Sequence, residues 1–240
     1  RDLHKEYRRQ RQMCIRDRVE PSYSELAEKS LAGELLSLAE MKSIIDGADE
    51  RLPELLEAAF RVRYHYFGKK VQIHVLMNAK IGLCPEDCGY CSQSRLSTAD
   101  ISKYPMLSQD RLLKGARAAK ESKAKRFCIV TSGRGATWGE VEYLSEAVRS
   151  IRDEVGIKVC CCLGLLDEPK AKVLKDAGVD RLNHNLNTSE EFYSEICTSH
   201  TYQDRFDTLQ ADRSAGLSLI TGANFAMGES NNDVIETLMP

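Results

Sequence analysis

The chain has 240 residues, of which 29% are charged and 42% hydrophobic, with a formal net charge of −2. This is the composition of an ordinary globular protein, and no apolar run approaches the roughly 18 residues of a membrane span. Residues 1–18 hold seven Lys or Arg and three Asp or Glu, so residues 19–240 carry a net charge of −6. That acidic remainder argues against nonspecific nucleic-acid binding. The nine cysteines are odd in number and clustered, and no secretory signal is visible, so we expect a cytoplasmic protein with metal chemistry rather than disulfides.

Two segments precede the main pattern. Residues 1–18 end in M-C-I-R-D-R, which resembles translated adaptor sequence from sequencing libraries, and we interpret them as a non-native scar outside the fold. Residues 19–68 are predicted to be a helical segment. Ser37 and Glu40 have capping-box spacing at the start of one helix, and Gly68 is a plausible stop for another.

From residue 69 to 240, short runs of β-forming residues alternate with amphipathic helices. Strands are predicted at 71–77, 126–131, 157–163, 181–186 and 217–221. Helices are predicted at 108–122, 139–154, 168–177, 189–196, 202–214 and from 232 onward. Successive β-α units predict an α/β protein with a parallel sheet and right-handed crossovers. A closed barrel has eight such units, so we expect a partial (β/α) barrel of about five units in a truncated chain.

The most informative stretch follows the first predicted strand. Cys84, Cys88 and Cys91 have C-x3-C-x2-C spacing, and Pro, Glu-Asp and Gly between them indicate a loop. Three thiolates on one loop suit a metal centre that needs several soft ligands. A cubane iron–sulfur cluster held by three cysteines leaves one iron open. A structural zinc needs four ligands, and no fourth Cys or His is near in the sequence. Zinc and unligated thiols remain the alternatives.

Two further cysteines occupy neighbouring predicted strands. Cys128 lies on the second strand and Cys160 on the third, so the thiols can come close. Cys160 and Cys162 share a face while Cys161 points away, and alternation alone does not choose between the first two. Each of them could equally be a buried core thiol.

The fourth predicted strand carries three amides. Alternation places Asn183, Asn185 and Asn187 on one face, with His184 on the other as a packing residue. Asn is depleted in strands, and aligned buried amides are unfavourable unless they bind a polar ligand. A ureido group or ribose hydroxyls would suit them.

Two residues beyond this strand are less decided. Arg205 lies on the next predicted helix and is either a carboxylate clamp or a solvated ion pair. His200 is expected at the surface.

Four motifs in order make the chain similar to the biotin synthase family of radical S-adenosylmethionine enzymes, from about residue 50 onward. They are C-P-E-D-C-G-Y-C from Cys84, R-F-C ending at Cys128, K-V-C-C-C-L-G from Lys158 and N-H-N-L-N-T from Asn183. The resemblance implies a radical-SAM (β/α)8 barrel, a homodimer and sulfur insertion into dethiobiotin, the last step of biotin synthesis. It also implies an electron donor such as flavodoxin or ferredoxin.

The resemblance further implies a role for each motif residue in binding S-adenosylmethionine. Cys84, Cys88 and Cys91 would bind a [4Fe–4S] cluster whose open iron chelates S-adenosylmethionine, and reductive cleavage would release a 5′-deoxyadenosyl radical. Tyr90 would lie against the adenine and Arg205 near the methionyl carboxylate.

The other motif residues would serve the ribose, the substrate and the sulfur source. Asn185 and Asn187 would lie near the ribose, and Asn183 and Asn185 would face the ureido ring of dethiobiotin. Cys128 and Cys160 would hold a [2Fe–2S] cluster that supplies the inserted sulfur.

One position departs from this pattern. Ile220 stands where the family has a third cysteine for the second cluster, and the family's fourth ligand, an arginine, would lie beyond Pro240. A radical enzyme of the same barrel type with only the first cluster is therefore an alternative. A metal-binding module without catalysis is another, and we expect the 240-residue chain alone to be inactive.

Overall fold

The computed structural model describes residues 22–82 and 84–239, so the interpretation of residues 1–18 lies outside it. The chain divides into two compact units, with the division between Lys70 and Val71. Each unit is described by itself.

The first unit consists of helices. They are α2 (Tyr23–Leu31), α3 (Leu38–Ile45), the 3-10 turn η1 (Asp49–Arg51) and α4 (Leu52–Phe67). Ser37 and Glu40 form the expected capping box of α3, and Gly68 follows α4. Tyr23, Leu26 and Ala58 are among the residues of a small buried cluster that joins α2 to α4.

The second unit alternates strands and helices. The strands are β1 (His74–Lys80), β2 (Arg126–Thr131), β3 (Lys158–Cys162), β4 (Val179–Asn183) and β5 (Ser218–Ile220). The helices are α5 (Gln109–Glu121), α6 (Trp138–Glu154), α7 (Glu168–Asp176), α8 (Tyr193–Ile196), α9 (Tyr202–Ser214) and α10 (Asn231–Leu238). In the part of the chain that the structure describes, no helix is both long and apolar enough to reach across a bilayer.

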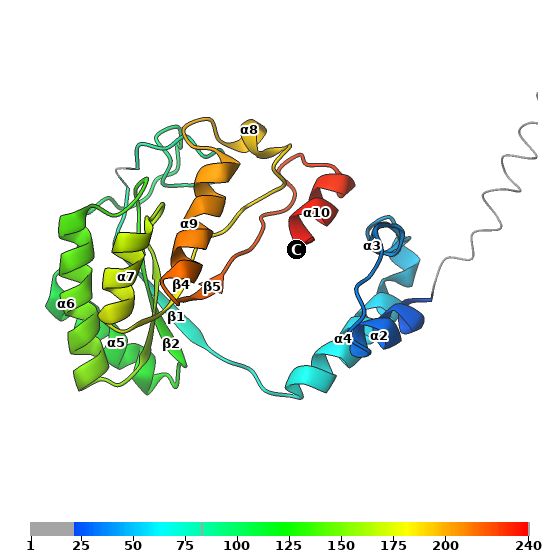
Figure 1. Cartoon of the computed structure of the whole chain (residues 1–240), viewed down its shortest axis with the longest axis horizontal. Coiled ribbons are helices and arrows are strands. Elements are labelled where there is room, and N and C mark those ends of the chain that lie inside the picture. The colour runs from blue at the N-terminus through cyan, green and yellow to red at the C-terminus, as the bar shows by residue number, and fades with distance from the viewer. Residues whose placement is uncertain (1–21, 83, 240) are drawn as a thin grey trace, which may run out of the picture. The chain divides into compact units, whose positions relative to one another are not determined.

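The five strands are parallel and lie in sequential order, β1-β2-β3-β4-β5. Helices α5, α6, α7 and α9 cover one face of this sheet (Figure 1). A doubly wound sheet reverses its strand order and carries helices on both faces. Sequential order with helices on one face is the arrangement of a (β/α)8 barrel, of which the described residues form an unclosed part.

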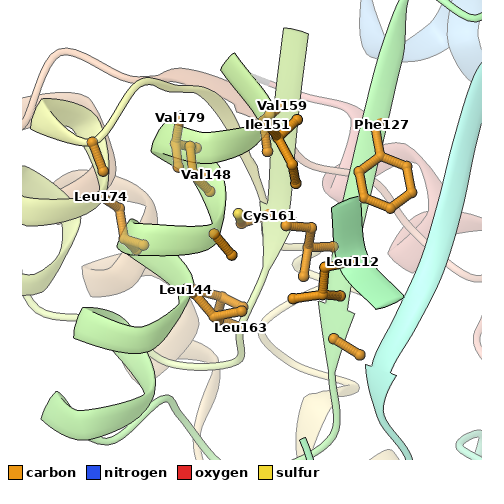
Figure 2. Packing of buried hydrophobic residues seen from close by; sticks show 14 of the residues in the cluster. Leu112, Phe127, Leu144, Val148, Ile151, Val159, Cys161, Leu163, Leu174 and Val179 are labelled. Carbon is orange, nitrogen blue, oxygen red and sulfur yellow. The ribbon is translucent and has the colours of Figure 1, made fainter. Parts of the chain in front are cut away.

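The main core lies between the sheet and these helices. Phe127 of β2, Val159 and Cys161 of β3 and Leu144 of α6 are buried in it (Figure 2). Because side chains alternate along a strand, the residues between them face the other side of the sheet. Cys161 is thus a core residue, as alternation predicts.

β2 has its predicted bounds, β3 and β5 are one residue shorter at each end, and β1 and β4 differ by more. β1 begins at His74 rather than residue 71 because its pairing with β2 begins where His74 meets Arg126. β4 ends at Asn183. Asn187 has a φ of 76°, a left-handed conformation that Asn tolerates better than most residues and that no strand contains.

Candidate functional site

The three-cysteine loop leaves the carboxyl end of β1, the end at which such sheets bind ligands. Backbone contacts hold both ends of the loop. Gly82 N–H donates to the Gln93 side chain at 3.0 Å, and Ser132 Oγ donates to the Gly82 carbonyl. Gly89 N–H donates to the Ile196 carbonyl at 2.9 Å, which brings the loop against a segment more than 100 residues away.

Buried carboxylates inside the loop form the strongest tether to this segment. Asp87 accepts from the N–H groups of Thr198 and Ser199, at 3.0 Å each, and from the Thr198 hydroxyl. The Thr198 hydroxyl bond, helped by the backbone donors, holds the pKa of Asp87 far below its usual range. Glu86 accepts from Ser199 Oγ at 2.7 Å. Neither carboxylate belongs to the site residues predicted from the sequence.

His200 is buried, so its expected surface position is wrong. Its Nδ1 lies 2.5 Å from Glu86 Oε2, and its Nε2 lies 3.1 Å from Arg205 Nη1. Burial lowers the pKa of His200 despite the neighbouring Glu86. The Glu86 carboxylate, which sits inside the loop, explains why a polar ring leaves the surface.

Cys197 was also missed, and the fold places it beside the loop. Its Sγ lies 3.7 Å from Cys88 Sγ, 3.3 Å from His200 Nδ1 and 3.3 Å from Asp87 Oδ1. These contacts join residues about 110 positions apart, and no spacing rule in the sequence predicts them. The T-S-H tripeptide that follows Cys197 was the one available signal, since three polar residues at the end of α8 need partners.

The cysteines of the loop differ in burial. Cys88 is buried, and Cys84 and Cys91 are half-buried. Burial raises the pKa of the Cys88 thiol to about 12, and the adjacent Cys197 adds to the shift. A free thiolate at Cys88 is therefore unfavourable without a compensating cation.

The polar residues predicted to surround the loop come together at its rim. Asn187 Nδ2 donates to the Tyr90 hydroxyl at 2.6 Å. Arg205 Nε donates to the Asn185 carbonyl. Tyr90 and the segment that follows β4 are thus linked directly, although Asn187 lies 97 positions after Tyr90 in the chain.

The single strand face predicted for the three asparagines is wrong, because β4 ends at Asn183 and Asn187 turns left-handed. Asn183 Oδ1 is buried without a hydrogen-bond partner among the described residues. His184 is buried as expected, but its Nε2 is also without a partner, and burial lowers its pKa to about 3. Unpartnered buried polar atoms are rare, and they mark this edge as a place for a polar ligand.

Cys128 and Cys160 lie directly opposite each other in the β2–β3 register. A hydrogen bond from the Cys160 thiol lowers the pKa of Cys128, and the charges of Arg126 and Arg181 act in the same direction. The same bond, together with burial, raises the pKa of Cys160. Cys128 is therefore the more readily ionised member of a pair on the face of the sheet away from the helices.

Ile220 and Cys162 lie one step further along this face. Ile220 is in register with Asn183 and offers no ligand atom. Cys162 is paired with Val130 and follows Cys160 by two residues, so it shares that face.

These residues fit iron–sulfur centres to different degrees. Three thiols on a loop at the carboxyl edge, with the Arg205 guanidinium joined to the loop through His200 and Glu86, suit a cubane with an open iron and a polar ligand. The Cys128–Cys160 pair supplies two of the four ligands of a two-iron centre, and Ile220 supplies none.

The fold and the three-cysteine loop define the class of the protein. The Radical SAM superfamily profile matches residues 80–239, which is most of the second unit. The chain belongs to the radical SAM superfamily.

Within that superfamily, the chain is similar to proteins named biotin synthase. It is 49% identical over 215 residues to one from Lysinibacillus sphaericus, with 90% of this chain and 65% of that protein covered. It is 48% identical over 214 residues to one from Bacillus subtilis, strain 168, with 89% and 64% covered. The chain thus spans about 65% of the length of these relatives.

Solved structures agree on the fold. The structure of methylornithine synthase superposes with a TM-score of 0.79 at 18% sequence identity. The match covers 88% of this chain and 62% of the methylornithine synthase chain. The FeFe-hydrogenase maturase HydG from Carboxydothermus hydrogenoformans has a TM-score of 0.75 at 23% identity, with 89% and 51% covered. At such identities the likeness concerns the fold alone.

Proposed function

We propose that the chain is the catalytic part of a biotin synthase, which inserts sulfur into dethiobiotin by radical S-adenosylmethionine chemistry. The observation that carries this proposal is the pairing of Cys128 with Cys160 across β2 and β3. The three-cysteine loop alone fits any member of the superfamily, whereas a second pair of thiols on the sheet, away from the helices, provides for a sulfur-donating cluster. The 44–49% identity to biotin synthases supports the same reaction.

Cys84, Cys88 and Cys91 would hold a [4Fe–4S] cluster, and Cys128 and Cys160 would hold a [2Fe–2S] cluster. When bound, the first centre supplies electron transfer to S-adenosylmethionine and the second supplies sulfur. Residues of the loop itself hold the three cysteines in place. The Asp87 bonds to the 198–199 backbone hold the loop's middle in place over the carboxyl edge.

Tyr90, Asn185, Asn187 and Arg205 would bind S-adenosylmethionine. The Asn187–Tyr90 hydrogen bond fixes the ring that would lie against the adenine. Arg205 is held by Nε on the Asn185 carbonyl and by Nη1 on His200 Nε2, so its Nη2 group would be the one to meet a carboxylate.

Asn183 and Asn185 would bind the ureido group of dethiobiotin. The Asn183 Oδ1 atom without a partner accepts one hydrogen bond, and a ureido N–H is a suitable donor. An electron donor such as flavodoxin or ferredoxin, a homodimer and a cytoplasmic location complete the proposal.

The test is anaerobic reconstitution with iron and sulfide, followed by reduction with S-adenosylmethionine and dethiobiotin. We expect dethiobiotin to increase the formation of 5′-deoxyadenosine. If the 240-residue chain alone shows no turnover, the same assay is made with a protein as long as the relatives. Substrate-independent cleavage in both proteins, with no biotin, would rule out the proposed reaction.

A second candidate function follows from Ile220. A radical enzyme that uses only the first cluster needs no ligand there. Replacing Ile220 by Cys separates the two: a gain of [2Fe–2S] absorption and of biotin supports biotin synthase, and no gain of either supports the single-cluster enzyme.

A further inference from the structure

We propose that Glu86 and His200 form a positioning relay for Arg205, which orients the Arg205 guanidinium toward the carboxylate of S-adenosylmethionine. Glu86 lies inside the three-cysteine loop, so the relay also ties the placement of Arg205 to the folding of that loop. The ligand given to Arg205 rests on the proposed function. The role of Glu86 and His200 is a separate claim with a test of its own.

The relay consists of two hydrogen bonds through one imidazole ring. His200 Nε2 lies 3.1 Å from Arg205 Nη1, and His200 Nδ1 lies 2.5 Å from Glu86 Oε2. A guanidinium has only donors, so Nε2 accepts from Arg205, and Nδ1 carries the ring proton and donates it to Glu86. Burial lowers the pKa of His200, which agrees with a neutral ring. His200 is 6% exposed and Glu86 5%, so water competes little for either bond.

The carboxylate end of the relay is fixed by further contacts. Glu86 Oε2 also accepts from Ser199 Oγ at 2.7 Å and from Arg134 Nη1 at 3.3 Å. The main-chain carbonyl of Glu86 accepts from the Arg95 N–H at 3.0 Å. Glu86 is therefore a held anchor that sets the orientation of the imidazole ring, rather than a side chain that follows it.

Arg205 is the end of the relay that needs to be oriented. It is half-buried on α9 and makes two bonds, from Nε to the Asn185 carbonyl and from Nη1 to His200. Acceptors at two nitrogens fix the plane of the guanidinium and leave Nη2 for a carboxylate. Without His200, only the Nε bond remains and the guanidinium can turn about it. A ligand would then have to order this side chain on binding, which lowers its affinity.

The test measures the binding of S-adenosylmethionine to the reconstituted protein by anaerobic calorimetry, before a reductant is added, so that no cleavage occurs. His200→Leu should weaken binding about tenfold, because Arg205 loses an acceptor. The [4Fe–4S] absorption should stay, since Asp87 still holds the loop. His200→Gln should stay within about threefold of the parent protein, because its amide N–H can donate to Glu86 while its amide oxygen accepts from Arg205.

Two comparisons separate a positioning role from a structural one. Decarboxylated S-adenosylmethionine lacks the group that Arg205 would meet, so His200→Leu should weaken its binding by less than about twofold. In an Arg205→Gln background, His200→Leu should weaken S-adenosylmethionine binding by less than about twofold further, since the relay acts through Arg205.

Asp212→Asn is the matched control on the same helix. The Asp212 side chain is buried in α9, and its carboxylate oxygens have no hydrogen-bond partner among the described residues. The variant changes a buried polar group without touching the relay, so S-adenosylmethionine binding should stay within about twofold of the parent protein. Circular dichroism establishes that each variant is folded.

Several results would overturn the relay. They are equal weakening of both ligands by His200→Leu, further weakening in the Arg205→Gln background, and a folded His200→Gln that binds as weakly as His200→Leu. A parent protein that binds neither ligand would also overturn it. Biotin formation judges the proposed function separately. Unchanged binding in His200→Leu with biotin formed removes the relay alone, and a carboxylate-selective loss without biotin removes the function alone.

Discussion

The three-cysteine loop and the Cys128–Cys160 pair are both candidate iron–sulfur ligand sets, but the chain holds them in different ways. The pair lies on two adjacent strands, and the parallel register places one residue opposite the other. The loop has no such frame. Its middle is held by Asp87 and Glu86, which bind the segment from Thr198 to His200.

This difference predicts how each site responds to change. Strand positions are backed by the core between the sheet and the helices, which resists rearrangement. A loop held by polar tethers can shift when those tethers change their protonation. The loop site should therefore be the more sensitive of the two to pH.

The largest expected effect is the independent loss of each centre. In an Ile220→Cys background, which supplies a third strand ligand, Cys88→Ala should abolish the [4Fe–4S] spectrum and all S-adenosylmethionine cleavage, because one of three loop ligands is lost, while the [2Fe–2S] absorption at the strands remains. In the same background, Cys160→Ala should abolish the [2Fe–2S] absorption and leave the [4Fe–4S] spectrum. Iron content and electron paramagnetic resonance measure both. Loss of both centres in Cys160→Ala would show that the two sites do not form independently.

The next effect is acid sensitivity at the end of β4. Burial lowers the pKa of His184 to about 3, whereas the unfolded chain takes up this proton near pH 6.5. Between these values the unfolded state binds more protons, so stability falls as pH falls, by about 2 kcal/mol between pH 7 and pH 5. Urea unfolding at the two pH values measures it. His184→Leu should remove this part of the pH dependence, and an unchanged dependence would contradict the assignment.

A smaller effect is expected from Tyr90→Phe. The variant leaves Asn187 Nδ2 without its acceptor, which should reduce stability by about 1 kcal/mol and weaken S-adenosylmethionine binding about fivefold. Tyr143→Phe is the control, since its hydroxyl binds the Leu107 carbonyl away from the loop. Equal weakening of ligand binding in both variants would remove the specific role of Tyr90.

The smallest effect sharpens the comparison on the strand side. Cys161→Ala removes a sulfur from the core (Figure 2), and Cys160 lies on the opposite face of β3 because side chains alternate along a strand. The substitution should reduce stability by about 1 kcal/mol and, in the Ile220→Cys background, leave both clusters unchanged. Loss of the [2Fe–2S] spectrum in a folded Cys161→Ala protein would place this thiol, rather than its neighbour, at the second centre.

Local sequence patterns were enough to predict most of the strands and helices. The alternation of Cys160, Cys161 and Cys162 assigned their faces, since the side-chain period of a strand is 2. The helix caps at Ser37 and Gly68 were visible because capping depends on neighbouring residues alone. The end of β4 could not be predicted from the sequence, because a strand ends where its pairing with the neighbouring strand ends. Asn187 takes a left-handed conformation where it pairs with Ala223.

By itself, the sequence determined which segments form strands and helices and which cysteines make up both ligand sets. It could do so because side-chain period, helix caps and motif spacing are local properties. The tertiary structure alone decided the surroundings of those thiols. Cys197 and His200 reach Cys88 only because the buried Asp87 and Glu86 side chains need hydrogen-bond donors, and the chain supplies these donors about 110 residues later. Contacts of that separation leave no periodic trace in a sequence, which is why neither Cys197 nor His200 was predicted to lie beside the loop.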